Sequence, residues 1–211
     1  QDGKNLGIWS RWWTVRGAAS DGFEEQGGEL VIHGNGRDLH HLGFSTLLVR
    51  PQEEFCFEIS AGVAIEDGGK KERNKDWDGG LTCYYDENSY LKLGLACRGG
   101  QPGILAAEYV DQGYVTERFL PLGMECCRAE LKIVTEHLRR ALYYRQEGEW
   151  QQAAVFENTA YLSSEGLNKG KRFTGATAGI YVNGQVTGRF SAVEIRCTEA
   201  GLWQDGKKQY N

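Results

Sequence analysis

Paired carboxylates are the first chemistry to look for, because two acids facing one groove can cleave a glycosidic bond as acid and as nucleophile or base. On a strand they need alternate positions, as in Glu-x-Asp-x-Glu, since residues two apart project from the same face. The chain contains no such triplet. Glu54 and Glu58 share one strand face, but it is the face that we assign to solvent. We therefore predict no catalytic residue within this chain.

Histidine and cysteine, the usual metal ligands, are poorly spaced for a metal site. His40 and His41 are adjacent, so on an extended backbone their rings point to opposite faces and cannot bind one ion. The six cysteines include no Cys-x-x-Cys pair. Asp86 and Asn88 could help to hold a structural calcium ion, although plain turn chemistry explains them equally well. We predict no other metal and no cofactor.

Aromatic side chains are the remaining candidates for binding. The adjacent pairs at 12–13 and 84–85 must place one ring on each face of a strand. The outer ring of each pair is then exposed, covered by a loop, or covered by a partner domain. Trp77 stands among acids at the end of a charged stretch that we expect to be a solvated loop. We predict Trp77, Trp12 and Tyr84 as contacts to a sugar or to another domain.

The elements that must position these residues show a period of two, which is typical of half-buried strands. Apolar residues occupy every second position from Phe55 to Ile65, and they do so again from Leu91 to Cys97, with Lys92 on the opposite side. Turn signals such as Asn183-Gly184 separate the runs, and helical periodicity is nowhere sustained. The pattern predicts an all-β, two-sheet antiparallel jelly-roll sandwich.

Composition limits the number of domains and the kinds of partner. A chain of 211 residues, 40% of them hydrophobic, suits one large β domain. We place this domain at 1–200 and a polar C-terminal extension at 201–211. The net charge of −5 gives no excess of positive charge that would bind nucleic acid. No apolar run is long enough for a membrane span.

Two further features concern the wider protein. The only methionine is Met124, so we expect Gln1 to be either a processed terminus or, as we favour, a cut inside a longer polypeptide. Free cysteine often behaves as a small buried hydrophobe. We therefore favour reduced thiols over disulfides, which predicts a cytoplasmic protein.

Three segments give the pattern a family signature. They are Gly80-Leu81-Thr82-Cys83-Tyr84-Tyr85-Asp86, Gly148-Glu149-Trp150 and Arg172-Phe173-Thr174-Gly175-Ala176-Thr177-Ala178-Gly179-Ile180-Tyr181. Together they resemble the C-terminal concanavalin A-like domain of family 43 glycoside hydrolases, which follows the catalytic propeller in β-xylosidases and related α-L-arabinofuranosidases. The resemblance extends from about Trp9 to about Cys197.

The resemblance implies an accessory, non-catalytic domain. In the family, an N-terminal β-propeller of the same polypeptide holds the catalytic carboxylates, and a sandwich loop brings a phenylalanine to the rim of the substrate pocket. The motif match assigns this role to Phe173, with Arg172 beside it facing propeller, substrate or solvent. The implied substrates, shared with the propeller, are xylo-oligosaccharides or arabinosides. Homo-oligomers are left open, and the alternative is a free-standing lectin-like carbohydrate-binding module.

Overall fold

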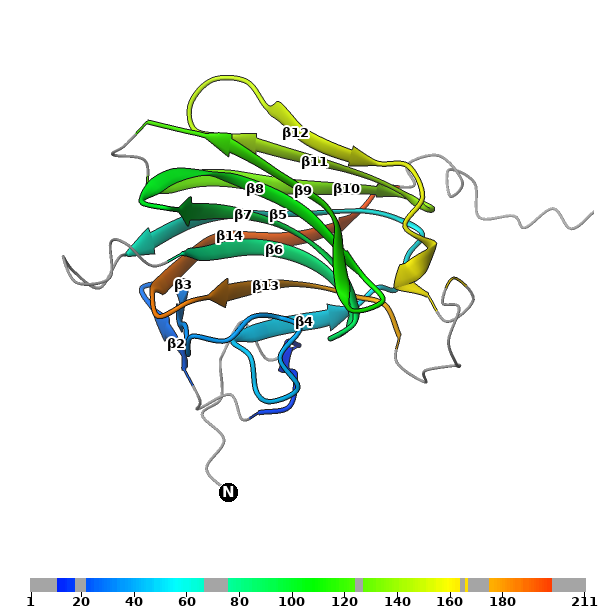
Figure 1. Cartoon of the computed structure of the whole chain (residues 1–211), viewed down its shortest axis with the longest axis horizontal. Coiled ribbons are helices and arrows are strands. Elements are labelled where there is room, and N and C mark those ends of the chain that lie inside the picture. The colour runs from blue at the N-terminus through cyan, green and yellow to red at the C-terminus, as the bar shows by residue number, and fades with distance from the viewer. Residues whose placement is uncertain are drawn as a thin grey trace, which may run out of the picture.

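Two antiparallel β-sheets make up the described part of the chain (Figure 1). The computed structural model describes residues 11–17, 22–66, 76–123, 127–163, 166 and 175–198. The strands are β1 (Trp13–Thr14), β2 (Phe23–Gln26), β3 (Glu29–His33), β4 (Leu47–Pro51), β5 (Cys56–Glu66), β6 (Trp77–Asp86), β7 (Ser89–Arg98), β8 (Gln101–Val110), β9 (Gly113–Pro121), β10 (Arg128–Glu136), β11 (Arg139–Arg145), β12 (Gln151–Phe156), β13 (Thr177–Asn183) and β14 (Thr187–Cys197), with one 3-10 turn, η2 (Ala160–Leu162).

Each sheet contains seven strands. Sheet A has the order β1-β4-β13-β6-β7-β8-β9, and sheet B has the order β12-β11-β10-β5-β14-β3-β2. The prediction of an all-β antiparallel two-sheet sandwich is confirmed. The extension predicted at 201–211 lies outside the described residues. Within those residues, no helix has the length and apolar character that crossing a membrane requires.

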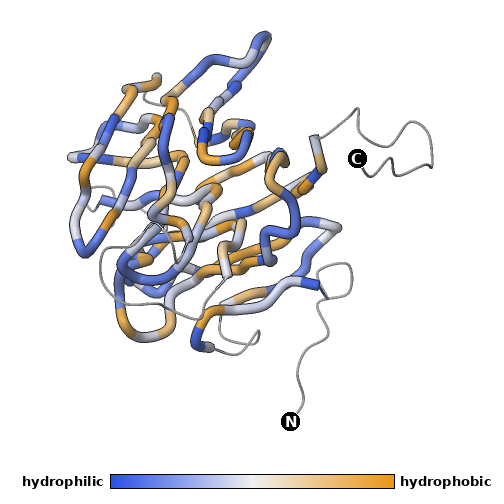
Figure 2. The backbone as a smooth tube through the Cα atoms, turned by 90° about the vertical axis from the view of Figure 1, so that its right-hand side faces the viewer, coloured by the Kyte–Doolittle hydropathy of each residue, from blue (hydrophilic) through white to orange (hydrophobic). Residues whose placement is uncertain are grey.

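β5 shows how alternation builds the core between the sheets. Its buried residues, at every second position, are Phe57, Ile59, Ala61, Val63 and Ile65. Figure 2 shows hydrophobic and hydrophilic stretches following one another along the backbone. Phe55 does not continue this face as predicted. It precedes the strand and is 71% exposed, because it lies in the connection from β4 to β5.

The central strands of sheet A depart from the simple pattern, because their outer face is buried as well. Every residue of β6 is buried, and so is every residue of β7 except Arg98. A second apolar cluster lies on this outer face, and it comprises Leu39, Leu47, Val49, Tyr84, Tyr90, Tyr109 and Tyr181. Leu39 comes from the segment between β3 and β4, which therefore helps to cover the sheet. Lys92 does lie opposite the core-facing leucines, but only 1% of its side chain is exposed.

None of the cysteines in the described residues forms a disulfide, and these are Cys56, Cys83, Cys97, Cys127 and Cys197. Cys83 and Cys97 are buried, whereas Cys127 and Cys197 are exposed. Burial raises the pKa of the Cys83 thiol, although Arg140 acts in the opposite direction. The thiolate is the reactive form. Burial therefore protects Cys83 in two ways, because it blocks the access of reagents and keeps the thiol protonated.

We expect Cys127 and Cys197 to react rapidly with a maleimide in the native protein at neutral pH. Cys83 and Cys97 should react only after unfolding, because reagent cannot reach them. Mass spectrometry of the labelled peptides measures both classes. Rapid modification of Cys83 in the folded chain would contradict the placement of β6.

Candidate functional site

The two acids considered for catalysis do not face one cleft. Glu54 is exposed in the connection from β4 to β5, where it lines a small cavity with Phe57. Glu58 lies on the outer face of sheet B, with its carboxylate 3.8 Å from the Lys132 ammonium. These positions fit two separate surface charges, which is how the sequence was interpreted.

The tryptophans predicted as surface contacts have different environments. Trp77 is the first residue of β6, is only 7% exposed and belongs to the core between the sheets. Trp77 lies on the same face of β6 as the core-facing Leu81. The strand begins directly after the charged stretch, whose composition gives no sign of it. Trp77 therefore offers no ring face to a sugar. Trp12 is half-buried and packs against the core, while its neighbour Trp13 is the exposed ring, at 48%.

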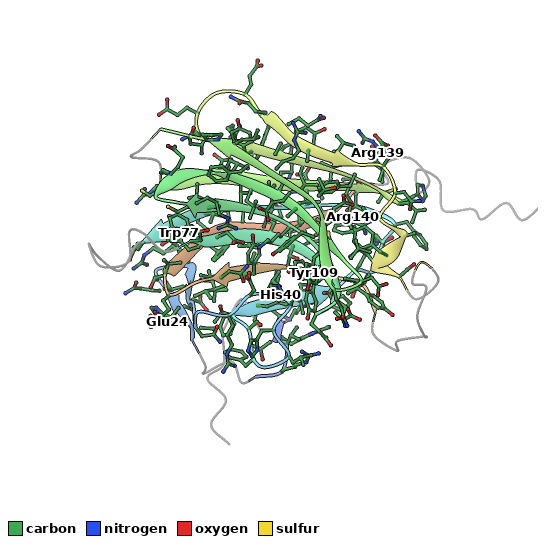
Figure 3. All side chains as sticks on the ribbon, in the orientation of Figure 1. Glu24, His40, Trp77, Tyr109, Arg139 and Arg140 are labelled. Carbon is green, nitrogen blue, oxygen red and sulfur yellow. The ribbon has the colours of Figure 1, made fainter. Side chains whose placement is uncertain are left out.

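Tyr84 belongs to a ladder of tyrosines on the outer face of sheet A. Tyr84, Tyr90, Tyr109 and Tyr114 are successive cross-strand partners from β6 to β9. Their ring centroids are 6.0, 4.9 and 5.0 Å apart, and the His40 ring stacks on Tyr109 at 5.1 Å (Figure 3). Cross-strand aromatic pairs stabilise a sheet. The chain itself thus covers most of Tyr84, which is 5% exposed.

A charge network that the sequence did not indicate lies on the same face. The Lys92 ammonium is 3.0 Å from one carboxylate oxygen of Asp78, and the Arg98 guanidinium is 2.9 Å from the other. Asn183 donates its amide to Asp78 at 3.1 Å, and Asp38 lies 3.7 Å from Lys92. Burial favours a raised pKa for Asp78, but Lys92 and Arg98 outweigh it and hold this pKa below the ordinary 3.8. Asp78 is therefore an ionised structural carboxylate.

The residues considered for calcium form a turn. The Asp86 carboxylate accepts a hydrogen bond from the backbone N–H of Asn88 at 2.8 Å, as in an Asx-turn. Among the residues that the structure describes, no three acidic, histidine or cysteine side chains cluster as metal ligands. The turn chemistry that the sequence offered is therefore observed, and the alternative of a structural calcium ion is untested.

One end of the sandwich collects exposed apolar side chains. We call it the β4–β5 end, and it lies at the right in Figure 1. It is formed by the strand connections at 51–55, 86–89, 111–112 and 137–138 and by residues 157–163 and 175–176. Phe55 is 71% exposed there and Leu138 is 50% exposed. Sequence reasoning missed both residues, because Phe55 matches the strand pattern and Leu138 lies in a polar turn.

Besides the small cavity that Glu54 lines, two larger cavities open near this end. One, of about 490 Å³, is lined by residues that include Trp13, Tyr84 and Gly175. The other, of about 430 Å³, is lined by residues that include Arg140 and Ala176. Both cavities therefore border the start of the signature strand. Arg172 and Phe173, predicted at a pocket rim, lie outside the described residues.

The two seven-stranded sheets and their shared core define a concanavalin A-like β-sandwich. A family model described as the beta-xylosidase C-terminal concanavalin A-like domain matches residues 2–194. The chain belongs to this family, as the motifs at 80–86 and 172–181 predicted.

Solved structures of family 43 glycoside hydrolases are similar. They include the xyloglucan PUL GH43B of Bacteroides ovatus (20% identity, TM-score 0.76, 89% of this chain and 36% of that one). BlXynB of Bacillus licheniformis has 25% identity and a TM-score of 0.73 over 86% of this chain and 35% of its own. The xylan beta-1,4-xylosidase of Bacillus halodurans has 22% identity and a TM-score of 0.72 over 85% and 35%. The chain thus spans about a third of each of these proteins. No curated protein matches it in sequence.

Proposed function

We propose that this chain is the accessory sandwich of a larger family 43 glycoside hydrolase. It packs against an N-terminal catalytic β-propeller and helps to close the propeller's pocket over xylo-oligosaccharides or arabinosides. The observation that carries the proposal is the family match over residues 2–194. The related structures support it, because two thirds of each lies outside the matched region.

The β4–β5 end is the surface that we assign to the propeller. Exposed apolar side chains that gather on one surface mark interaction sites. Phe55 and Leu138 line one cavity there, and Trp13 lines the other. Residues 175–177 border both cavities and directly follow the segment that contains Phe173 in the sequence. Docking at this end would hold that segment near the propeller.

The purified chain 1–211 should not hydrolyse nitrophenyl xyloside or nitrophenyl arabinofuranoside, because the catalytic carboxylates are assigned to the propeller. A chromogenic assay measures this, with the longer polypeptide as the positive control. Turnover by the chain that one acidic substitution abolishes would contradict the proposal.

Xylo-oligosaccharides should bind the isolated chain weakly or not at all, since its exposed aromatic rings are assigned to a domain interface. Calorimetric titration with xylotetraose tests this. A micromolar dissociation constant would favour the alternative of a free-standing lectin-like module.

A further inference from the structure

Arg140 is a buried cation without a charged partner among the described residues. It is the second residue of β11, and its side chain is 3% exposed. One terminal nitrogen donates to the Thr159 hydroxyl, and the other donates to the Gln52 side-chain oxygen at 3.1 Å. The Nε–H has no oxygen acceptor, and the guanidinium also lies within hydrogen-bonding reach of the uncharged Cys83 thiol. Arg139, labelled beside it in Figure 3, instead pairs with Glu136 and Glu157 at 3.0 and 3.4 Å.

A guanidinium stays protonated in proteins, and a buried charge without a partner is strongly destabilising. The groups packed near Arg140 do not neutralise it. Burial keeps the Cys83 thiol protonated by raising its pKa. Glu108 accepts a hydrogen bond from the Tyr161 hydroxyl at 3.0 Å and makes no ion pair with Arg140. The charge of Arg140 therefore calls for an anion from outside the described residues.

The cavity of about 430 Å³ at the β4–β5 end offers that anion a path, because Arg140 lines it. We call it the Arg140 cavity. Phe55 and Leu138 form its exposed rim. The Phe55 ring stacks on His137 with centroids 6.2 Å apart. Thr159 fixes the adjacent turn, since its N–H and hydroxyl donate to the Leu138 carbonyl at 2.9 and 2.6 Å.

We propose that the Arg140 cavity is a socket for a side-chain carboxylate of the propeller domain. The carboxylate pairs with the guanidinium, including its unsatisfied Nε–H, while Phe55 and Leu138 pack on the aliphatic stem. An apolar rim around a buried charge is how interfaces desolvate an ionic anchor. A free sugar acid would leave this rim exposed, so the side chain is the better occupant. This inference rests on the proposed function, because it needs the propeller.

Arg140→Met tests the socket because it should act differently on the isolated chain and on the longer polypeptide. In the isolated chain, removing an unpaired buried charge should leave the melting temperature unchanged or raise it. In the longer polypeptide, the same substitution should lower the melting temperature of the sandwich by about 5 °C, because it leaves the propeller carboxylate unpaired. Arg139→Met is the matched control and should have little effect in either protein. Equal destabilisation of both proteins by Arg140→Met would overturn the proposal.

Leu138→Asp separates the socket from the docking on which it rests. If Leu138→Asp uncouples the two domains but Arg140→Met does not, docking stands and the socket is wrong. If neither substitution affects the longer polypeptide, the proposed docking fails as well. Glucuronate titrated into the isolated chain tests the other source of a carboxylate. Binding at millimolar concentration that Arg140→Met abolishes would overturn the socket in favour of a sugar-acid site.

Hydrogen exchange of the unmodified proteins tests the proposal without any substitution, so it still decides if a variant fails to fold. Amides at 136–140 and 159–163 should exchange more slowly in the longer polypeptide than in the isolated chain. Equal exchange rates in the two proteins would contradict the proposal.

Discussion

Replacing Asp78 by alanine is expected to lower the melting temperature of the chain by about 10 °C. The substitution leaves Lys92, which is 1% exposed, and Arg98 without their shared carboxylate. Removing one partner from a buried ion network lowers the free energy of unfolding by about 3–5 kcal/mol. Each kcal/mol shifts the melting temperature of a domain of this size by about 2–4 °C. Differential scanning calorimetry measures the shift.

Asp38→Ala is the matched control for this result. Asp38 also faces Lys92, but its carboxylate is 3.7 Å away and 42% exposed, so solvent screens the pair and the loss should be under about 1 kcal/mol. A shift for Asp78→Ala as small as that of Asp38→Ala would contradict the buried network.

The pH dependence of the Asp78 effect has a defined sign. The folded-state pKa of Asp78 lies below its ordinary value of 3.8 because Lys92 and Arg98 outweigh the effect of burial. The ionised carboxylate thus contributes stability above pH 3.8, and this contribution is lost as pH falls toward the folded-state pKa. The stability difference between the native chain and Asp78→Ala should therefore narrow below pH 4 in urea unfolding. A difference that stays constant from pH 6 to pH 3 would show that ionisation of Asp78 is not what stabilises the fold.

Phe173→Ala should impair catalysis in the longer polypeptide and leave the isolated chain nearly unchanged. The family resemblance assigns Phe173 to the rim of the propeller pocket, where a buried aromatic anchor can contribute about 2 kcal/mol. The expected loss in kcat/KM on short xylo-oligosaccharides is therefore about 30-fold.

Melting of the isolated chain distinguishes this role from a core role. A core phenylalanine cut to alanine would cost roughly 3–5 kcal/mol of stability, so a large drop in melting temperature would contradict a rim position for Phe173. Tyr143→Ala, at a half-buried position of β11, serves as the control for kcat/KM and should leave it unchanged.

The alternation of apolar and polar residues was enough to predict the sandwich, because a strand with one face in the core and one in solvent repeats with a period of two. The prediction failed where the outer face of sheet A is covered. The sequence placed Lys92 opposite the core-facing leucines but did not indicate that Lys92 and Asp78 are buried, since charges are rarely buried unless paired. Their pairing joins two strands across 14 residues of sequence, and no local pattern records such a contact. Trp77 was misplaced for a related reason, as the charged residues before it resemble a loop.

The candidate site was harder to predict than the fold. Arg140 follows Arg139, and two adjacent arginines in a strand are normally interpreted as surface charges. The alternation of β11 nevertheless contained a signal, since Arg140 shares its face with the buried Leu142 and Tyr144. No sequence pattern indicated that Arg140 would lack a carboxylate partner there, because this depends on residues that meet only after folding.

Hydroxyl-radical footprinting of the isolated chain and of the longer polypeptide tests the central claim most directly. If the β4–β5 end docks on a propeller, Phe55, Leu138 and Trp13 should lose most of their reactivity in the longer polypeptide. Trp150, in the β11–β12 turn at the opposite end of the sandwich, should react equally in both. Undiminished oxidation of Phe55 and Leu138 in the longer polypeptide would contradict the account.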